Sequence, residues 1–326
     1  MTTARRYSCM LKSLRLVILL LLAANVASSQ LTYQTLYVDY DSAKTYKNLT
    51  IIPIRPRANG FGGQAKMLYS YPDVISLSQA LKQGLVTISE RGTASTENVH
   101  WLRINNKSNK SIYIASGEMI MGGRQDRMVT RDTVLAPSDH DEYIPVMCVE
   151  EGRWSDKEKK FAYYNYANPR LRKVLDQSKN QLLIWKEILG QLDYSKVNST
   201  SLAYTARRQD KKFSLVQEDY YHYFLNQFRN VDSILAGFVC ISGDKIIGCD
   251  IFAGINLFHG QLEPLLQGYI EEAIVYGYTG PYPKEKVQEY LDKILTSETQ
   301  QQQYLEKNGK IYRYKNRIFH ITGYAP

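Results

Sequence analysis

The feature that most constrains the fold of this 326-residue chain is a change of hydrophobic periodicity between its two halves. In the first half, short segments rich in β-branched and aromatic residues lie between turn residues and predict strands. These segments are 49–54, 86–89, 99–104, 111–115, 128–135 and 142–149. In the second half, apolar residues recur at helical spacing. This order predicts an α+β fold, with an antiparallel β-sheet or sandwich in the N-terminal half and helices packed on it from the C-terminal half.

Capping residues place the helices. Ser76 and Gln79 form a capping box, and with Gly84 as the stop they predict a helix of about two turns. Asn168-Pro169 supplies an N-cap and a first turn for the next helix. The patterns that follow predict helices over 168–190, 213–229, 264–276 and after Pro283, a hairpin over 238–252, and closing strands over 310–321.

The first 29 residues have the three-part layout of a secretory signal peptide. A basic start precedes an apolar run over 16–24, which is too short to span a bilayer, and the run is followed by the small residues Ala27-Ser28-Ser29. We predict cleavage before Gln30, with cleavage after Ala27 as the alternative, and a single α+β domain over 30–326. The protein is then exported to the periplasm or the extracellular space, and no membrane span remains.

The charge balance bears on possible partners. The chain carries 41 basic and 32 acidic side chains, and the signal segment holds 4 of the basic and none of the acidic ones. The remainder therefore has 37 basic against 32 acidic side chains, spread along the sequence rather than gathered in a basic stripe. This distribution argues against a nucleic-acid partner.

Cysteine and histidine usage indicates neither a metal site nor a cofactor. Cys148, Cys240 and Cys249 follow the signal segment, and the last two flank the predicted hairpin. A disulfide between Cys240 and Cys249 is geometrically allowed there, but two buried thiols are the preferred interpretation. The sequence contains no CxxC or HExxH motif, and its five histidines are scattered. We therefore expect neither a bound metal nor a cofactor.

Five motifs occur in a characteristic order: NLTIIPI, VISLSQALKQGLVTISE, SGEMIMGGRQDR, IPVMCVEEGRW and AGFVCISGDKIIGCDIF. In this order they resemble a biochemically uncharacterised family, the ARG-and-rhodanese-phosphatase-superfamily-associated protein domain family, where ARG stands for ADP-ribosylglycohydrolase. The resemblance covers about residues 45–280. It implies an association with ADP-ribose metabolism, because the family name refers to neighbouring genes, and it implies no particular reaction.

The candidate site lies in residues 117–154, where charged residues and glycines stand among strand-like apolar ones. Strand alternation puts Glu118 and Glu150 at the ends of two core-facing rows. An ionised carboxylate in such a place costs several kcal/mol unless it is paired. We therefore predict that both carboxylates converge with Arg127 and Arg153.

Two interpretations of this cluster stay open. In the functional one, a carboxylate acts as general base, arginines clamp an anion, and two glycines let the backbone approach a ligand. In the structural one, the same charges pair across strands and the glycines form a turn; Glu90 and Asp250 end other strands and are assigned such a structural role. The predicted catalytic residues are Glu118 and Glu150, and the predicted ligand-binding residues are Gly122, Gly123, Gln125, Asp126, Arg127, Arg153 and Trp154.

Three functions are compatible with this cluster. The preferred one is an exported ligand-binding or sensing module for a phosphorylated or sugar-containing small molecule. The first alternative is a hydrolase that acts on an ADP-ribose-like or glycan substrate through paired carboxylates. The second alternative is a structural scaffold without a small-molecule site. The sequence decides neither whether the protein is an enzyme nor which oligomeric state it adopts.

Overall fold

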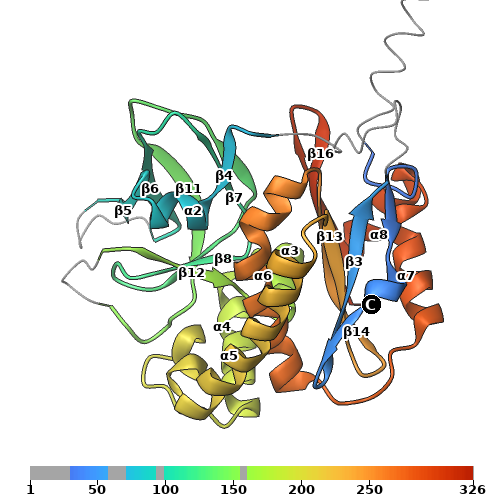
Figure 1. The fold of residues 1–326 in the computed structure, drawn as a ribbon. Helices are drawn as coiled ribbons and strands as arrows, with labels where there is room; N and C mark the ends of the chain where they lie inside the picture. Colours follow the sequence, from blue (N-terminus) through green and yellow to red (C-terminus); the bar gives the residue numbers. More distant parts are fainter. Residues whose placement is uncertain (1–29, 58–70, 93–98, 155–159, 326) are drawn as a thin grey trace, which may run out of the picture.

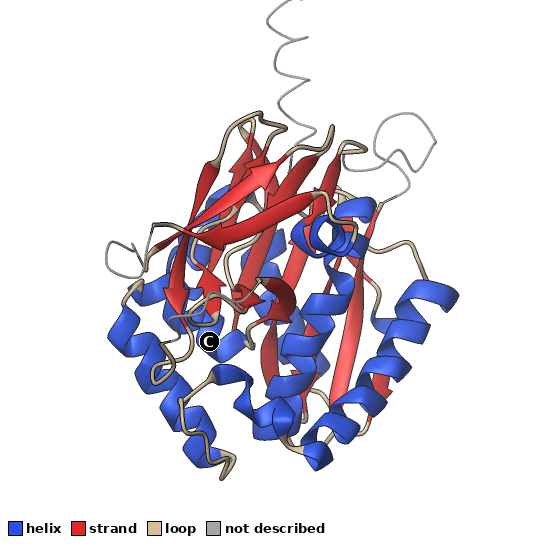
Figure 2. Cartoon of the chain, turned by 90° about the vertical axis from the view of Figure 1, so that its left-hand side faces the viewer, coloured by secondary structure: helices blue, strands red, loops and turns tan. Residues whose placement is uncertain are grey.

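The computed structural model describes residues 30–57, 71–92, 99–154 and 160–325. The predicted signal peptide over 1–29 lies outside the described residues. Antiparallel strands fill most of the N-terminal half and helices most of the C-terminal half, so the predicted α+β class is confirmed. Figure 2 shows the helices on either side of the strands.

The largest sheet joins strands from both ends of the chain. Its order is β1–β3–β13–β14–β16–β15, with β2 paired to β3, and each pairing is antiparallel. The strands are β1 (Leu36–Val38), β2 (Lys44–Tyr46), β3 (Leu49–Pro56), β13 (Gly237–Ser242), β14 (Lys245–Phe252), β15 (Gly309–Tyr314) and β16 (Arg317–Tyr324). Three of these strands fall where the sequence predicted LTIIPI and the central hairpin, and β15 and β16 are the predicted closing strands.

The remaining strands form two smaller sheets. A six-stranded sheet has the order β12–β8–β9–β11–β6–β5, and a three-stranded sheet has the order β10–β7–β4, in which β4 and β7 are parallel. The strands are β4 (Val74–Ser76), β5 (Val86–Glu90), β6 (Trp101–Asn106), β7 (Ser111–Ile114), β8 (Glu118–Met121), β9 (Arg127–Val129), β10 (Thr133–Leu135), β11 (Glu142–Cys148) and β12 (Ala162–Tyr166).

Helices cover both faces of the large sheet. The α-helices of the described residues are α2 (Leu77–Lys82), α3 (Pro169–Ser178), α4 (Gln181–Tyr194), α5 (Lys211–Leu225), α6 (Ile255–Tyr276), α7 (Lys284–Leu295) and α8 (Glu298–Asn308). In Figure 1, α6 runs between the six-stranded sheet and the large sheet, and α7 and α8 lie on the opposite side of the large sheet. The core is divided accordingly: Phe238 and Leu262 pack on the α6 side, and Val239 and Leu291 on the α7 side.

The central hairpin settles the state of two cysteines. Its two-residue turn is Gly243-Asp244, and the register shifts between Cys240, which faces Gly248, and Ile241, which faces Ile246. This bulge puts Cys240 in the core on the α6 side and Cys249 in the core on the α7 side. Both are buried free thiols, as preferred from the sequence, and burial raises the pKa of Cys249 to about 12.

The predicted strand over 128–135 is wrong as one element. The chain forms β9, leaves the six-stranded sheet and re-enters the three-stranded sheet as β10. Asp132 lies at this break, where its carboxylate accepts hydrogen bonds from Tyr113 and Lys310. The polar partners of Asp132 therefore interrupt a segment that its β-branched residues would otherwise keep extended.

Two helix boundaries also differ from the prediction. The helix over 168–190 is divided, because Lys179 adopts a left-handed conformation with φ of 46° and Asn180 caps a new helix through the amide of Leu182. The helix predicted to begin at Pro264 begins at Ile255 instead and keeps the proline in its interior. Burial of the apolar face on both sides of Pro264 outweighs the lost backbone hydrogen bond, which costs about 3 kcal/mol.

The capping box is confirmed at the start of α2. The Ser76 hydroxyl accepts from the Gln79 amide at 3.2 Å, and the Gln79 side chain accepts from the Ser76 amide at 3.1 Å. Among the helices of the described ranges, none is both long and apolar enough to cross a membrane.

Candidate functional site

Arg153 is the centre of the cluster predicted from the sequence. Its Nε donates to Glu150 at 2.6 Å, and its Nη2 donates to Asp126 Oδ1 at 2.9 Å. The same guanidinium also donates to the carbonyls of Gly123 and Gly122, at 3.2 and 3.3 Å. Its side chain is 23% exposed. Four of the five N–H donors of this arginine are therefore directed at the protein's own acceptors.

Side-chain hydrogen bonds hold the loop over 122–126 in place. Asp126 accepts from the Gly122 amide at 3.0 Å, and burial, the largest cause, raises its pKa. Glu150 accepts from the Ser201 hydroxyl at 2.8 Å as well as from Arg153. Gln125 donates to the carbonyl of Glu150 at 2.8 Å. Predicted ligand-binding residues thus form a closed network with one another.

The glycine pair is required by the protein's own packing. Gly122 and Gly123 have φ of 121° and 50°, which residues with a Cβ rarely adopt. A Cβ at Gly122 would come within 3.1 Å of Phe161 Cα, and one at Gly123 would overlap the Phe161 ring and the Glu90 carboxylate. The sequence predicted that these glycines let the backbone approach a ligand; in the structure they let it approach Lys160 and Phe161, just before β12.

Arg127 joins this network from β9. It is fully buried, and its Nη2 lies 3.7 Å from Glu90 Oε2, while its Nη1 donates to Gln125 at 3.4 Å. Glu90 also accepts from the Arg124 amide at 2.7 Å. Glu90 is therefore part of the cluster in the structural role that the sequence assigned to it.

Trp154, the last predicted ligand-binding residue, lies at the edge of the cluster. Its side chain is 46% exposed, and the Arg124 guanidinium lies 5.8 Å from its ring centroid. The pair resembles an exposed cation–π contact, which contributes about 0.5–1 kcal/mol. Trp154 thus contacts the cluster from outside.

Glu118 lies apart from the other predicted residues. β7 ends at Ile114 and Gly117 turns the chain with φ of 91°, so the row from Ile112 does not continue to Glu118, contrary to the prediction. Glu118 is fully buried and accepts from the Ala115 amide at 2.7 Å and from the Tyr163 hydroxyl at 3.0 Å. Its contacts in the described chain include none with Arg127, Glu150 or Arg153.

We expect Glu118 to make stability depend on pH. Burial raises its pKa to about 8 against the opposing hydrogen bonds, so the folded protein holds a proton that the unfolded chain releases near pH 4.5. The free energy of unfolding then falls as pH rises from about 5 to 8, by at most about 1.4 kcal/mol per pH unit. Glu118→Gln imitates the neutral carboxyl, so relative to wild type it should gain about 3–4 kcal/mol between pH 5 and pH 8.

Urea unfolding at pH 5, 6, 7 and 8 measures this difference. The control is Glu151→Gln, which changes an exposed carboxylate and should follow the wild-type pH profile. Parallel profiles for Glu118→Gln and wild type would show that Glu118 is ionised in the folded protein across this range.

A second buried network surrounds Asp250 on β14. Arg172 from α3 donates to its two oxygens at 2.9 and 2.7 Å, Tyr269 from α6 donates at 2.8 Å, and His320 and Thr322 from β16 lie at 2.9 and 2.8 Å. Asp250 is fully buried, and Arg172 together with His320 holds its pKa well below the usual range against the cost of burial.

The network continues from His320 toward Asp132. His320 Nδ1 lies 2.8 Å from the Tyr113 hydroxyl, which donates to Asp132 at 2.8 Å, and Lys310 donates to Asp132 at 2.7 Å. With Tyr113 donating to Asp132, its oxygen accepts from His320 Nδ1, and Nε2 faces the Asp250 carboxylate. Both ring nitrogens of His320 are therefore engaged inside this buried network.

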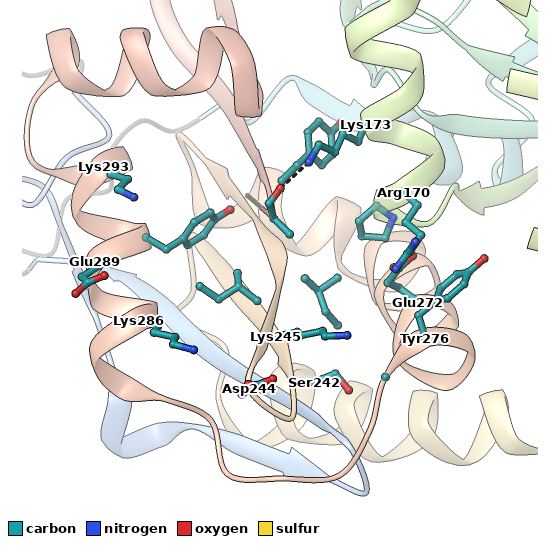
Figure 3. A pocket seen from close by; sticks show the side chains of 17 residues that line it. Arg170, Lys173, Ser242, Asp244, Lys245, Glu272, Tyr276, Lys286, Glu289 and Lys293 are labelled. Carbon is teal, nitrogen blue, oxygen red and sulfur yellow. Dashed lines mark hydrogen bonds and ion pairs between the residues drawn. The ribbon is translucent and has the colours of Figure 1, made fainter. Parts of the chain in front are cut away.

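A cavity lies elsewhere, between α3, α6, α7 and the β13–β14 hairpin. It has a volume of about 700 Å³, within the usual range for small-molecule sites. Five basic side chains line it, against three acidic ones. The basic residues are Arg170, Lys173, Lys245, Lys286 and Lys293, and the acidic ones are Asp244, Glu272 and Glu289. In Figure 3, α7 supplies charges on one side and α3 on the other.

Contacts with other residues hold several side chains in the wall of this cavity in place. Arg170 Nε donates to Glu272 at 2.6 Å, and its guanidinium lies 3.9 Å from the Tyr276 ring centroid. Burial, the largest cause, raises the pKa of Glu272 to about 7, although Arg170 opposes this shift. Lys173 donates to the carbonyl of Ala325 at 2.8 Å, the contact dashed in Figure 3.

Neither the Asp250 network nor the cavity was assigned as a site from the sequence. The signal for the network was Asp250, a carboxylate in a segment of apolar residues, together with His320 and Thr322 two apart on one strand face. No such signal in the sequence indicated the cavity. Its lysines come from α3, α7 and the hairpin, and in the sequence each of them resembles an ordinary solvated charge.

The chain is an α+β protein with a cavity that is lined by basic and aromatic side chains. The cavity lies beside an antiparallel sheet whose strands come from both ends of the chain. This chain belongs to the ARG and Rhodanese-Phosphatase-superfamily-associated Protein domain family, whose model matches residues 37–324. The match confirms the resemblance and extends it beyond the 45–280 region at both ends. The comparison with curated proteins gives no match, and neither does the comparison with solved structures.

Proposed function

We propose that this protein binds a small phosphorylated ligand in the cavity between α3, α6, α7 and the β13–β14 hairpin. The main support for the proposal comes from the ion-pair partners of three lysines in the cavity wall. Within the described residues, no carboxylate lies within ion-pair distance of Lys245, Lys286 or Lys293. Unpaired cations around one concave surface bind phosphate oxygens through charge-assisted hydrogen bonds.

This proposal keeps ligand binding, the function preferred from the sequence, but assigns it to the cavity instead of the cluster around Arg153. The cluster around Arg153 has its charges directed at one another. The cavity instead offers lysines without an ion pair in the described residues, two of which, Lys245 and Lys293, lie over the rings of Tyr278 and Tyr304. Its apolar lining is formed by Ile246, Ile247 and Tyr290. A ligand with phosphate and sugar groups fits such a lining, and ADP-ribose, to which the family name alludes, is one compound of this class. The family name supports the choice of ADP-ribose as a probe.

The hydrolase alternative has less support at the predicted carboxylates. Glu150 accepts from Arg153 and Ser201, and Glu118 accepts from Ala115 and Tyr163. Both carboxylates are at least 95% buried, and neither lines the cavity described above. A general base needs its proton donor within hydrogen-bond reach. We therefore propose ligand binding rather than hydrolysis.

We expect Lys286→Ala combined with Lys293→Ala to weaken binding of ADP-ribose by roughly 100-fold or more, because two charge-assisted hydrogen bonds of about 1.5–3 kcal/mol each are lost. Isothermal titration calorimetry at low and high salt measures the effect. Lys186→Ala, on the exposed face of α4, is the matched control and should bind like wild type. Equal affinity in the double variant and the control, or no binding of any phosphorylated probe by wild type, would leave the scaffold alternative.

We also propose that the protein is exported with Gln30 as its first residue. The basic start, the apolar run and Ala27-Ser28-Ser29 motivate this proposal. Cleavage there leaves the folded part intact, because Leu31 is buried and its carbonyl accepts from Gln301 at 2.9 Å. N-terminal sequencing of the protein recovered outside the cytoplasm should read Gln-Leu-Thr. An intact Met1 would contradict export by this route.

A further inference from the structure

Helix α4 carries leucines on the face that points to solvent. Leu182, Leu183 and Leu189 are 70%, 45% and 41% exposed. The opposite face of the same helix packs into the core, so the exposed leucines do not serve this packing. The exposed residues of α7 are by contrast all charged or amide side chains, namely Lys284, Glu285, Lys286, Gln288, Glu289 and Lys293. Apolar side chains gathered on one exposed face indicate a partner that covers them.

Two opposite charges lie on the same face of α4. Lys186 and Asp193 are exposed, and a spacing of seven positions puts them two turns apart on one side of the helix. They are about 10 Å apart along the helix axis, at 1.5 Å per residue, so they do not pair with each other. The ion pairs formed within the described ranges include neither of them. Both charges are therefore available to a partner.

A second copy of α4 complements this face in one orientation. When two antiparallel copies cross midway between Leu189 and Gly190, Lys186 of each copy lies opposite Asp193 of the other, and two ion pairs form. Leu189 of each copy lies opposite Gly190 of the other, where a Cβ would meet nothing within 4 Å, so the leucine side chain has room. Parallel copies would instead place Lys186 beside Lys186 and Asp193 beside Asp193, which is repulsive. Charge complementarity therefore selects the antiparallel pair.

We propose that two copies of this protein associate through the exposed faces of their α4 helices, with the helices antiparallel. The face has one exposed cation and one exposed anion, so it has no charge surplus that would attract an anionic membrane. One helix pair buries less than the roughly 1,600 Å² of a standard interface, so the association is weak, with a dissociation constant in the micromolar range. No residue of this face lines the cavity of the proposed function, so the two proposals are independent.

Analytical ultracentrifugation of the protein that begins at Gln30, the proposed exported form, tests this dimer. We expect the mean mass to rise from one chain to two between micromolar and millimolar concentrations. Lys186→Glu and Asp193→Lys each place like charges at both contacts, so the copies of each variant should associate at least about tenfold more weakly. Lys186→Glu combined with Asp193→Lys exchanges the two charges and should regain the wild-type dissociation constant. Recovery in this double variant requires the antiparallel arrangement.

Lys307→Glu is the matched control. It reverses an exposed lysine on α8, across the large sheet from α6 (Figure 1), and should leave the dissociation constant unchanged. Thermal melts of the single variants should match wild type, since both side chains are exposed. A wild type that stays monomeric throughout this concentration range would overturn the proposal, and so would dimers that neither single reversal weakens. A double variant as weak as the single ones would contradict the antiparallel pairing. Association that occurs only in the full chain, with residues 1–29 present, would assign the leucine face to that segment instead of a second copy.

Discussion

Asp250→Asn is expected to lower the free energy of unfolding by about 3–5 kcal/mol, the usual cost of breaking a buried ion pair from one side. Arg172 is 1% exposed, and both of its terminal nitrogens donate to Asp250. An asparagine of the same shape keeps the packing but leaves this guanidinium buried without a counter-charge. The change also removes the negative charge that faces His320 and replaces one acceptor oxygen by a donor.

Urea unfolding of Asp250→Asn measures the loss, and Asp244→Asn in the exposed turn of the same hairpin is the control, with an expected change within about 0.5 kcal/mol. Combining Asp250→Asn with Arg172→Met removes the unpaired charge, so the double variant should be less destabilised than the sum of the single variants, by about 1 kcal/mol or more. Additive losses would show that Arg172 and Asp250 do not stabilise one another.

Arg153→Ala separates the two interpretations of the cluster predicted from the sequence. The structural interpretation predicts a loss of about 3 kcal/mol, at the lower end for a buried pair because the Arg153 side chain is 23% exposed. Its removal leaves Glu150 and Asp126 without their shared cation and frees the carbonyls of Gly122 and Gly123. If the cluster is instead a ligand site, the same change should cost little stability and abolish binding.

Thermal melts and urea unfolding of Arg153→Ala answer this question before any ligand is known. The control is Arg131→Ala, which removes an exposed arginine from the same part of the chain and should change stability by less than about 0.5 kcal/mol. A melting temperature of Arg153→Ala equal to that of the control would contradict the structural role and return the cluster to the list of candidate binding sites.

Local signals predicted the elements of this fold well. Ser76 with Gln79 marked the start of α2, and β-branched runs marked β3, β5 and β11. The errors arose where tertiary contacts override local pattern. The heptad spacing from Leu175 to Leu182 continues across the break at Lys179, so periodicity alone joins α3 to α4. Pro264 resembles a first-turn proline, but burial of the helix before it extends α6 backward.

The candidate site could be predicted from the sequence only in part. The cost of an unpaired buried charge correctly brought Glu150 and Arg153, three residues apart, into contact, and Arg127 into the same network. Glu118 was placed with them because its strand was assumed to continue through Gly117, whose left-handed turn sends the side chain elsewhere. The cavity required the relative placement of α3, α6 and α7, which no local pattern encodes.

The position of β16 has a consequence for how the polypeptide is made. This strand, over residues 317–324, lies inside the large sheet between β14 and β15, and it supplies His320 and Thr322 to the buried carboxylate of Asp250. During synthesis β1, β2 and β3 emerge before β16, so the strands made first cannot complete their sheet until this strand has also been made. Folding that depends on such long-range pairing is slow, and slow folding is compatible with the proposed export, which needs an unfolded chain.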